Sequence, residues 1–176
     1  MKYIVAMLCS VTLMMAEGFT LKSDDLGGQL TVAQEFNGFG CSGKNISPSL
    51  SWENAPKGTK SFAITVYDPD APTGSGWWHW QVVNIPVSIT SISTDASAKK
   101  ALPKGALEIT NDYGMVGFGG ACPPEGDKAH QYIVTVHALD VDTLPVETGT
   151  NAPIVGYQIN AHTIAKASLI SYYGRD

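Results

Sequence analysis

The chain has 176 residues, of which 44% are hydrophobic and 15% charged, a composition typical of one globular domain and not of a disordered chain. Its 16 acidic and 11 basic residues give a net charge of −5, which disfavours nucleic acid or an anionic membrane surface as a partner attracted by bulk charge. The 18 glycines and 10 prolines occur in short clusters, and this spacing of turn residues favours a fold of many short strands.

The first 18 residues have the pattern of a secretory signal peptide. Lys2 precedes a mostly apolar run that is too short to span a bilayer comfortably. Ala16 and Gly18 are small residues two positions apart, as a signal peptidase site requires. We therefore predict a signal peptide at 1–18, cleaved near Gly18, a mature domain over 19–176, and a periplasmic or secreted location without integral membrane association. A buried N-terminal strand or helix is the alternative.

Short strands and turns alternate along most of the chain. Strands are predicted at 19–22, 30–36, 49–52, 60–67, 77–85 and 131–139. Residues 87–118 are rich in Ser, Thr, Asp, Lys and Gly, and we expect them to form a long irregular excursion over the surface. A helix is predicted over 152–163, and the alternating segment 165–173 predicts a last strand. The pattern indicates a single mainly β domain.

Cleavage of the predicted signal peptide would remove Cys9 and leave two cysteines, Cys41 and Cys122. Both lie in glycine-rich loops. An even pair of cysteines in an exported protein favours a disulfide. Such a bond would close a loop of about eighty residues and stabilise the domain by about 2–4 kcal/mol. Two buried free thiols are the alternative.

The first cluster of candidate functional residues is DPDAPTGSGWWHW at 68–80. Asp68 and Asp70 directly follow a predicted strand, where aspartates commonly accept hydrogen bonds from turn amides. His79 is expected to face away from both neighbouring tryptophans, toward solvent or a cavity. The intervening turn would bring His79 back near an aspartate, whose carboxylate would orient the imidazole and favour its protonated form.

The second cluster is CPPEGDKAHQY at 122–132, where a stiff Pro-Pro pair leads into a strand. His130 and Tyr132 share one face of that strand. An ordinary loop entering a core strand is the alternative. The chain contains no G-x-S-x-G, H-E-x-x-H, P-loop or dinucleotide motif, so we expect no cofactor. A metal site built from Asp68, His79 and His130 has no ligand spacing to recommend it.

Taken together, the two clusters resemble the motifs of the phosphatidylethanolamine-binding protein family, also called the Raf kinase inhibitor protein family. That family combines Asp-Pro-Asp-x-Pro and a nearby His-Trp with Pro-Pro, a glycine-containing loop and His-x-Tyr. Here the matching residues are Asp68, Pro69, Asp70, Pro72, His79 and Trp80, then Pro123, Pro124, Gly126, His130 and Tyr132. TGSGWWHW and the closing VGYQINAH are similar to the bacterial Raf-kinase-inhibitor-like branch. The resemblance covers about 19–176.

The resemblance implies two antiparallel sheets with Greek-key connections and a few short peripheral helices, one of them near the C-terminus. It also implies a small surface pocket for anions such as phosphate, acetate or phosphoethanolamine. The pocket residues it implies are Asp68, Asp70, Pro72, His79, Cys122, Pro123, His130 and Tyr132. Animal members usually carry Arg where this chain has Gln131, and the loss of a fixed cation is expected to weaken anion affinity or to alter folding contacts.

We therefore expect an exported, non-catalytic protein that binds a small anion or phosphate head group and modulates a partner protein. One alternative is an inhibitor that docks on a protease, a kinase or another signalling protein through surface loops such as 87–118. An exported hydrolase with an Asp/His or metal site is a further alternative. Nucleic acid is not an expected partner.

Overall fold

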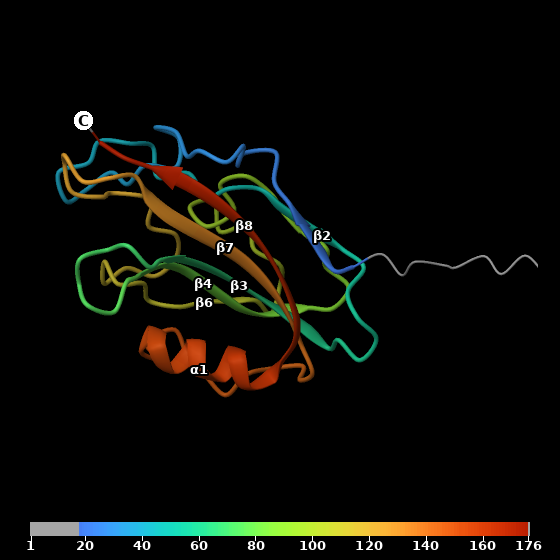
Figure 1. The fold of residues 1–176 in the computed structure, drawn as a ribbon. Helices are drawn as coiled ribbons and strands as arrows, with labels where there is room; N and C mark the ends of the chain where they lie inside the picture. Colours follow the sequence, from blue (N-terminus) through green and yellow to red (C-terminus); the bar gives the residue numbers. More distant parts are fainter. Residues whose placement is uncertain (1–17, 176) are drawn as a thin grey trace, which may run out of the picture.

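The computed structural model describes residues 18–175, which form two antiparallel sheets and one α-helix (Figure 1). The smaller sheet has the order β1-β2-β5 and consists of β1 (Thr20–Lys22), β2 (Leu50–Glu53) and β5 (Ser91–Ile92). The larger sheet has the order β6-β4-β3-β7-β8 and consists of β6 (Leu107–Glu108), β4 (Trp77–Pro86), β3 (Ser61–Asp68), β7 (His130–Leu139) and β8 (Thr163–Tyr173). The helix α1 (Ala152–His162) lies against the outer face of this larger sheet (Figure 1).

The mainly β fold class is confirmed, and so is the helix near the C-terminus. Within the larger sheet, β7 returns after a long connection to pair with β3, so that β7-β3-β4-β6 has the strand order of a Greek key. The described residues contain one α-helix where a few were expected. None of the helices described in 18–175 is both long and apolar enough to cross a membrane. The predicted signal peptide lies, apart from Gly18, outside the described residues.

Alternation along the strands builds two hydrophobic cores, one on each face of the larger sheet. On β3, Phe62 and Ile64 face the smaller sheet and pack in a core that also contains Trp52 and Trp80. Ala63 points to the opposite face. There it joins the core that α1 covers, which contains Val83, Ile109, Leu139, Val155 and Ile159. The two cores hold the larger sheet between two layers and fix the direction in which its strand ends project.

The structure corrects two predicted segments. Residues 30–36 do not form a strand: Thr31 closes a turn by accepting the backbone N–H groups of Gln34 and Glu35, and only an isolated bridge joins Glu35 to Ala121. The side chain of Gln34 accepts the Thr31 N–H and hydroxyl, and this local bonding outweighs the β propensity of the segment. The excursion 87–118 is not wholly irregular either, because it contributes β5 and β6 to the two sheets.

Candidate functional site

The two sequence clusters meet at one end of the larger sheet, where β3 ends and β4 and β7 begin. Asp68 pairs with Trp77 across β3 and β4, and Tyr67 pairs with Ile133 across β3 and β7. A cavity of about 230 Å³ opens at this end. Seven of the eight sequence-predicted ligand residues line it, namely Asp68, Pro72, His79, Cys122, Pro123, His130 and Tyr132.

Asp68 organises the interior of this cavity. It is the last residue of β3, and its side chain is buried. One carboxylate oxygen accepts the backbone N–H groups of Asp70 and Ala71 at 2.8 and 3.1 Å, so the first turn after the strand wraps around it. The other oxygen accepts Nδ1–H of His130 at 2.8 Å. Turn chemistry and imidazole orientation, which the sequence offered as separate functions of the aspartates, are thus combined in one side chain.

His79 reaches the cavity because β4 contains a β-bulge. The register between β3 and β4 shifts between Val66, which pairs with Trp80, and Tyr67, which pairs with Trp78, so that His79 is the extra residue. Trp80 lies in the core between the sheets, whereas Trp78 packs on Tyr67 at the other face. The expectation that His79 faces away from both tryptophans is therefore wrong, because the bulge breaks the strict alternation on which it was based.

Both ring nitrogens of His79 are buried, and only one has a hydrogen-bond partner among the described residues. Nδ1 lies 2.7 Å from the carbonyl oxygen of Gly119. Since a carbonyl can only accept, Nδ1 carries the hydrogen and donates it. Nε2 has no hydrogen-bond partner among residues 18–175. Burial lowers the pKa of His79 to about 4, against the opposing effects of the Gly119 carbonyl and of Asp68, so the ring is neutral at physiological pH.

Two further buried polar atoms of the cavity lining lack a partner in the described part of the chain, namely the hydroxyl of Tyr132 and Nε1 of Trp77. Burial is also the main reason why the pKa of Tyr132 lies far above its usual value, and that hydroxyl therefore stays protonated. His130, whose Nδ1 is committed to Asp68, has its Nε2 3.5 Å from a carboxylate oxygen of Asp127. Unsatisfied buried polar atoms are uncommon in folded proteins, and three of those in 18–175 line this one cavity.

Asp70, the eighth sequence-predicted residue, does not line the cavity. Its carboxylate bonds Nζ of Lys128 at 2.9 Å and accepts the backbone N–H of Gln131 at 2.9 Å. The hydrogen bond from Lys128, followed by that from Gln131, holds the pKa of Asp70 below its usual value. Asp70 thus ties the first cluster to the second from outside the cavity.

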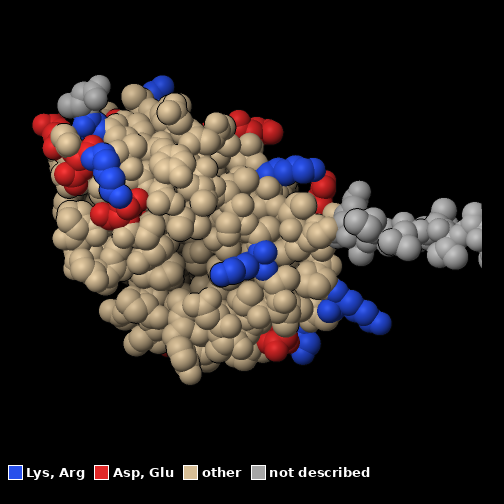
Figure 2. All heavy atoms as spheres, in the orientation of Figure 1, with Lys and Arg blue, Asp and Glu red and all other residues tan. Residues whose placement is uncertain are grey.

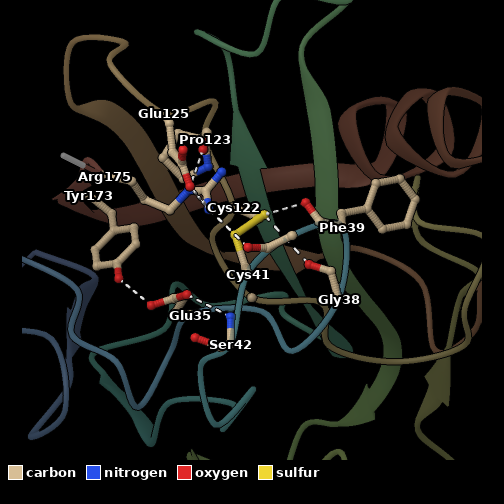
Figure 3. Close-up of a disulfide and its surroundings, with 12 residues drawn as sticks. Glu35, Gly38, Phe39, Cys41, Ser42, Cys122, Pro123, Glu125, Tyr173 and Arg175 are labelled. Atoms are coloured by element: carbon tan, nitrogen blue, oxygen red, sulfur yellow. Dashed lines mark hydrogen bonds and ion pairs between the residues drawn. A yellow bond between two sulfur atoms is a disulfide. The ribbon is translucent and has the colours of Figure 1, made fainter.

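The disulfide predicted as the favoured state of the cysteines is present, with the Cα atoms of Cys41 and Cys122 5.9 Å apart (Figure 3). Cys122 lines the cavity, and the loop that carries Cys41 also carries Phe39, a rim residue whose exposed fraction is 70%. Phe39 has a left-handed backbone with a φ of 55° and packs edge-on against Tyr113 at 5.2 Å. The bond therefore fastens one wall of the cavity to the other.

Arg175 supplies the cation that the sequence motif lacks. It follows β8 and lines the cavity, donating from Nε to the carbonyl of Pro123 at 2.8 Å and from Nη1 to that of Gly40 at 3.1 Å (Figure 3). These two carbonyls flank the disulfide on both sides. The guanidinium is thus held at the rim although Gln131 stands where animal members usually have arginine. No pattern in the sequence connected the C-terminal segment with this site.

Sequence reasoning also missed three aromatic residues of the cavity lining, namely Phe39, Trp77 and Tyr113. Trp77 lies inside the first cluster, and its aromatic character was a usable signal. Trp77 and Phe39 both contact Tyr113 edge-on, with ring centroids 5.1 and 5.2 Å from it. The cavity therefore has hydrogen-bonding groups in its interior and aromatic surface at its mouth.

Charged side chains of both signs gather at the end that carries the C-terminus and again at the opposite end, whereas the face between them, formed by β8, β7 and α1, shows few (Figure 2). Near the cavity the cations are paired, Lys128 with Asp70 and Arg175 with Glu125. An anion would therefore be held by individual donors inside the cavity and not by a cationic surface, in agreement with the net charge of −5.

Comparison with known proteins gives consistent matches over nearly the whole described chain. The family model for phosphatidylethanolamine-binding protein matches residues 22–174. The UPF0098 protein YbcL of Escherichia coli is 52% identical over 162 residues, which cover 90% of this chain and 88% of the relative. The UPF0098 protein YbhB of the same organism is 46% identical, with coverage of 87% and 98%.

Solved structures give the same result. The crystal structure of E. coli YbcL, described as a new member of the mammalian PEBP family, matches with a TM-score of 0.87 at 51% identity and covers 90% of this chain and 99% of its own. A homologue from Chlamydia trachomatis matches with a TM-score of 0.73 at 29% identity, and the coverage is 90% and 98%.

Proposed function

Because the chain belongs to the phosphatidylethanolamine-binding protein family, we propose that its cavity binds a small oxyanion, in particular the phosphate group of a phosphorylated head group such as phosphoethanolamine. The observation that carries this proposal is the pair of buried, unpartnered atoms in the cavity lining, Nε2 of His79 and the hydroxyl of Tyr132. The Tyr132 hydroxyl can donate a hydrogen bond to a ligand oxygen, and Nε2 of His79 can accept one from a ligand hydroxyl. Arg175 adds a permanent positive charge at the rim.

The aromatic mouth suits the remainder of such a ligand. Phe39, Trp77 and Tyr113 present ring faces and edges beside the cavity. Aromatic rings contact alkyl groups through dispersion and attract ammonium groups through their π-electrons. A phosphate that carries a short alkyl or aminoalkyl substituent would thus be bound at both ends.

We propose binding without catalysis. Nδ1 of His79 bonds to a carbonyl and Nδ1 of His130 to a carboxylate, so within the described part of the chain neither imidazole is hydrogen-bonded to a hydroxyl or thiol that it could activate as a nucleophile. Residues 18–175 also contain no group of three or more His, Cys, Asp or Glu side chains arranged to hold a metal ion. Turnover of ester or phosphate substrates that is lost in His130→Ala would contradict the proposal.

A histidine NMR titration tests anion binding directly. Addition of phosphoethanolamine should shift the ring resonances of His79 and His130. Those of His137 and His162, which hydrogen-bond to Thr163 and Asp140 outside the cavity, serve as controls within the same molecule and should stay in place. Saturating ligand without a shift at His79 or His130 would refute the proposed site.

A conservative substitution adds a quantitative test. Tyr132→Phe removes only the buried hydroxyl, and we expect it to weaken phosphoethanolamine binding about tenfold, the usual contribution of one hydrogen bond. Tyr157→Phe on α1 is the matched control, because that hydroxyl belongs to an exposed residue outside the cavity. Equal affinity of the two variants would exclude the Tyr132 hydroxyl as a ligand contact.

We further propose that the protein is exported and that it presents the loaded cavity to a partner protein. The disulfide fits an oxidising compartment, and the exposed ring of Phe39 beside the cavity offers apolar contact area to a partner. Mass spectrometry of the protein recovered from its cell would test export: a mature N-terminus near Gly18 is expected, and an intact Met1 would contradict export. Partner capture that is unchanged in His79→Ala would show that docking uses another surface, as an inhibitor acting through loops would.

A further inference from the structure

The hydrogen-bonding state of His79 restricts which anions the proposed site can accept. Nδ1 must carry the hydrogen, because its partner is the carbonyl of Gly119. A neutral ring then presents only a lone pair at Nε2, and this atom has no partner within 18–175. A lone pair repels a fully ionised oxygen. A hydrogen must therefore lie between Nε2 and the ligand oxygen before the two can bond.

The groups around His79 do not supply that hydrogen from the protein. Asp68 has both oxygens occupied as acceptors, and His130 donates its Nδ1–H to Asp68. Tyr132 and Tyr113 face the ring edge-on, with centroids 5.1 and 5.6 Å away, and within 18–175 the Tyr132 hydroxyl makes no hydrogen bond to Nε2. At the mouth, Arg175 is bonded to backbone carbonyls, and Asp127 contributes a carboxylate near His130.

We propose that the cavity binds its anion together with one hydrogen shared between Nε2 of His79 and a ligand oxygen, and that it thereby selects proton-bearing oxyanions, phosphate monoesters, over sulfates. This inference rests on the proposed function and names the ligand class of the same site. A phosphate monoester loses its second proton with a pKa of about 6 and can bring the hydrogen itself. A sulfate ester stays fully ionised, so it can bond to Nε2 only after His79 has taken up a proton from solvent. Burial, which lowers the pKa of His79 to about 4, makes that protonation rare at neutral pH.

The size of the selectivity follows from the two proton affinities. Phosphoethanolamine and 2-aminoethyl hydrogen sulfate have the same shape, and both complexes contain one shared hydrogen. Above pH 6 both affinities should fall about tenfold for each pH unit, so their ratio stays constant. The ratio of the two affinities is set by the difference between the pKa of the phosphate, about 6, and the pKa of His79, about 4. A difference of two pKa units corresponds to about a hundredfold preference for the phosphate.

Calorimetry with these two probes tests the inference. At pH 7.5 we expect about a hundredfold tighter binding of phosphoethanolamine, and below pH 6 the gap should narrow as the sulfate affinity continues to rise. Titrations in buffers of different ionisation enthalpy should show close to one proton taken up per sulfate ester bound. Equal affinities at pH 7.5 without proton uptake would overturn the inference and leave the proposed anion site intact. If neither probe binds at any pH, both the proposed function and this inference fail.

A matched pair of variants isolates His79. His79→Gln places an amide N–H donor near the position of Nε2 at every pH, and it should bring the two affinities close to parity. His137→Gln is the control, because His137 is likewise buried with a pKa lowered to about 4 by burial and by Lys166, yet it lies outside the cavity lining. It should keep the full preference. Should His79→Gln fail to fold because the Gly119 carbonyl loses its donor, the pH profile and proton count of the unmodified protein still decide the question.

Discussion

Replacing both bridging cysteines, as Cys41→Ala with Cys122→Ala, should lower the free energy of unfolding while leaving the folded structure in place. The two residues are 81 positions apart, so reduction frees a long loop in the unfolded chain. The loop-closure relation gives about 4.5 kcal/mol for a loop of this length. That loss is a large part of the 5–15 kcal/mol that is typical of a single domain, and the variant should still fold.

The folded state should persist because other bonds already join the same loops. The backbone N–H of Phe36 donates to Ala121 at 2.9 Å, and the N–H of Ala121 donates to Gln34 at 3.0 Å. Arg175 adds its two bonds to the carbonyls of Gly40 and Pro123 (Figure 3). The disulfide therefore acts mainly on the unfolded chain, whose freedom it restricts.

Equilibrium unfolding in urea measures this effect. The double variant and the unmodified protein with a reducing agent should lose the same amount of stability, and far-ultraviolet circular dichroism should stay unchanged. A loss below about 1 kcal/mol would refute the loop-closure reasoning. A large fall in phosphoethanolamine affinity at unchanged circular dichroism would show instead that the bond shapes the folded cavity.

Three further variants, one of them a control, test the contacts around the site. Gly76→Ala combines a φ of +67° with overlap of the new Cβ and the Tyr67 ring, so it should lower the free energy of unfolding by more than about 2 kcal/mol. Gly74→Ala is the control, because Gly74 has a φ of +81° but open space around it, and the variant should lose only about 1–2 kcal/mol through backbone strain. Equal losses in the two variants would refute the steric argument. Glu35→Gln removes a buried carboxylate that accepts the Tyr173 hydroxyl, whose hydrogen bond holds the pKa of Glu35 below 4.5 (Figure 3). The depressed pKa of Glu35 contributes stability above pH 4.5, and this stability is lost as the pH falls. The variant should therefore be about 1–3 kcal/mol less stable than the unmodified protein at pH 7, and the difference should shrink below pH 4.5. A difference in urea unfolding that stays constant from pH 7 to pH 3 would contradict this link between the ionisation of Glu35 and stability.

Local patterns in the sequence were sufficient for most of the strands and for the two halves of the site. Alternation in 60–67 and 131–139 identified β3 and β7, because the core between the two sheets requires apolar residues at every second position of these strands. The same kind of pattern wrongly predicted a strand at 30–36. Its β-forming residues are overridden by the Thr31–Gln34 side-chain bonds, which periodicity does not record.

Residue types and their short spacing were enough to predict the fold class and the paired motifs that hold Asp68, His79, His130 and Tyr132. The cysteine count favoured the disulfide without deciding it. How these residues meet depends on contacts between segments that are distant in the sequence. The bulge that turns His79 into the cavity depends on register with β3, and Arg175 reaches the rim because β8 pairs with β7 and ends beside the disulfide. Which ring nitrogen of His79 is free likewise depends on a carbonyl forty residues away, at Gly119. Contacts between distant segments depend on the packing of the whole chain, and for that reason no local sequence pattern predicts them.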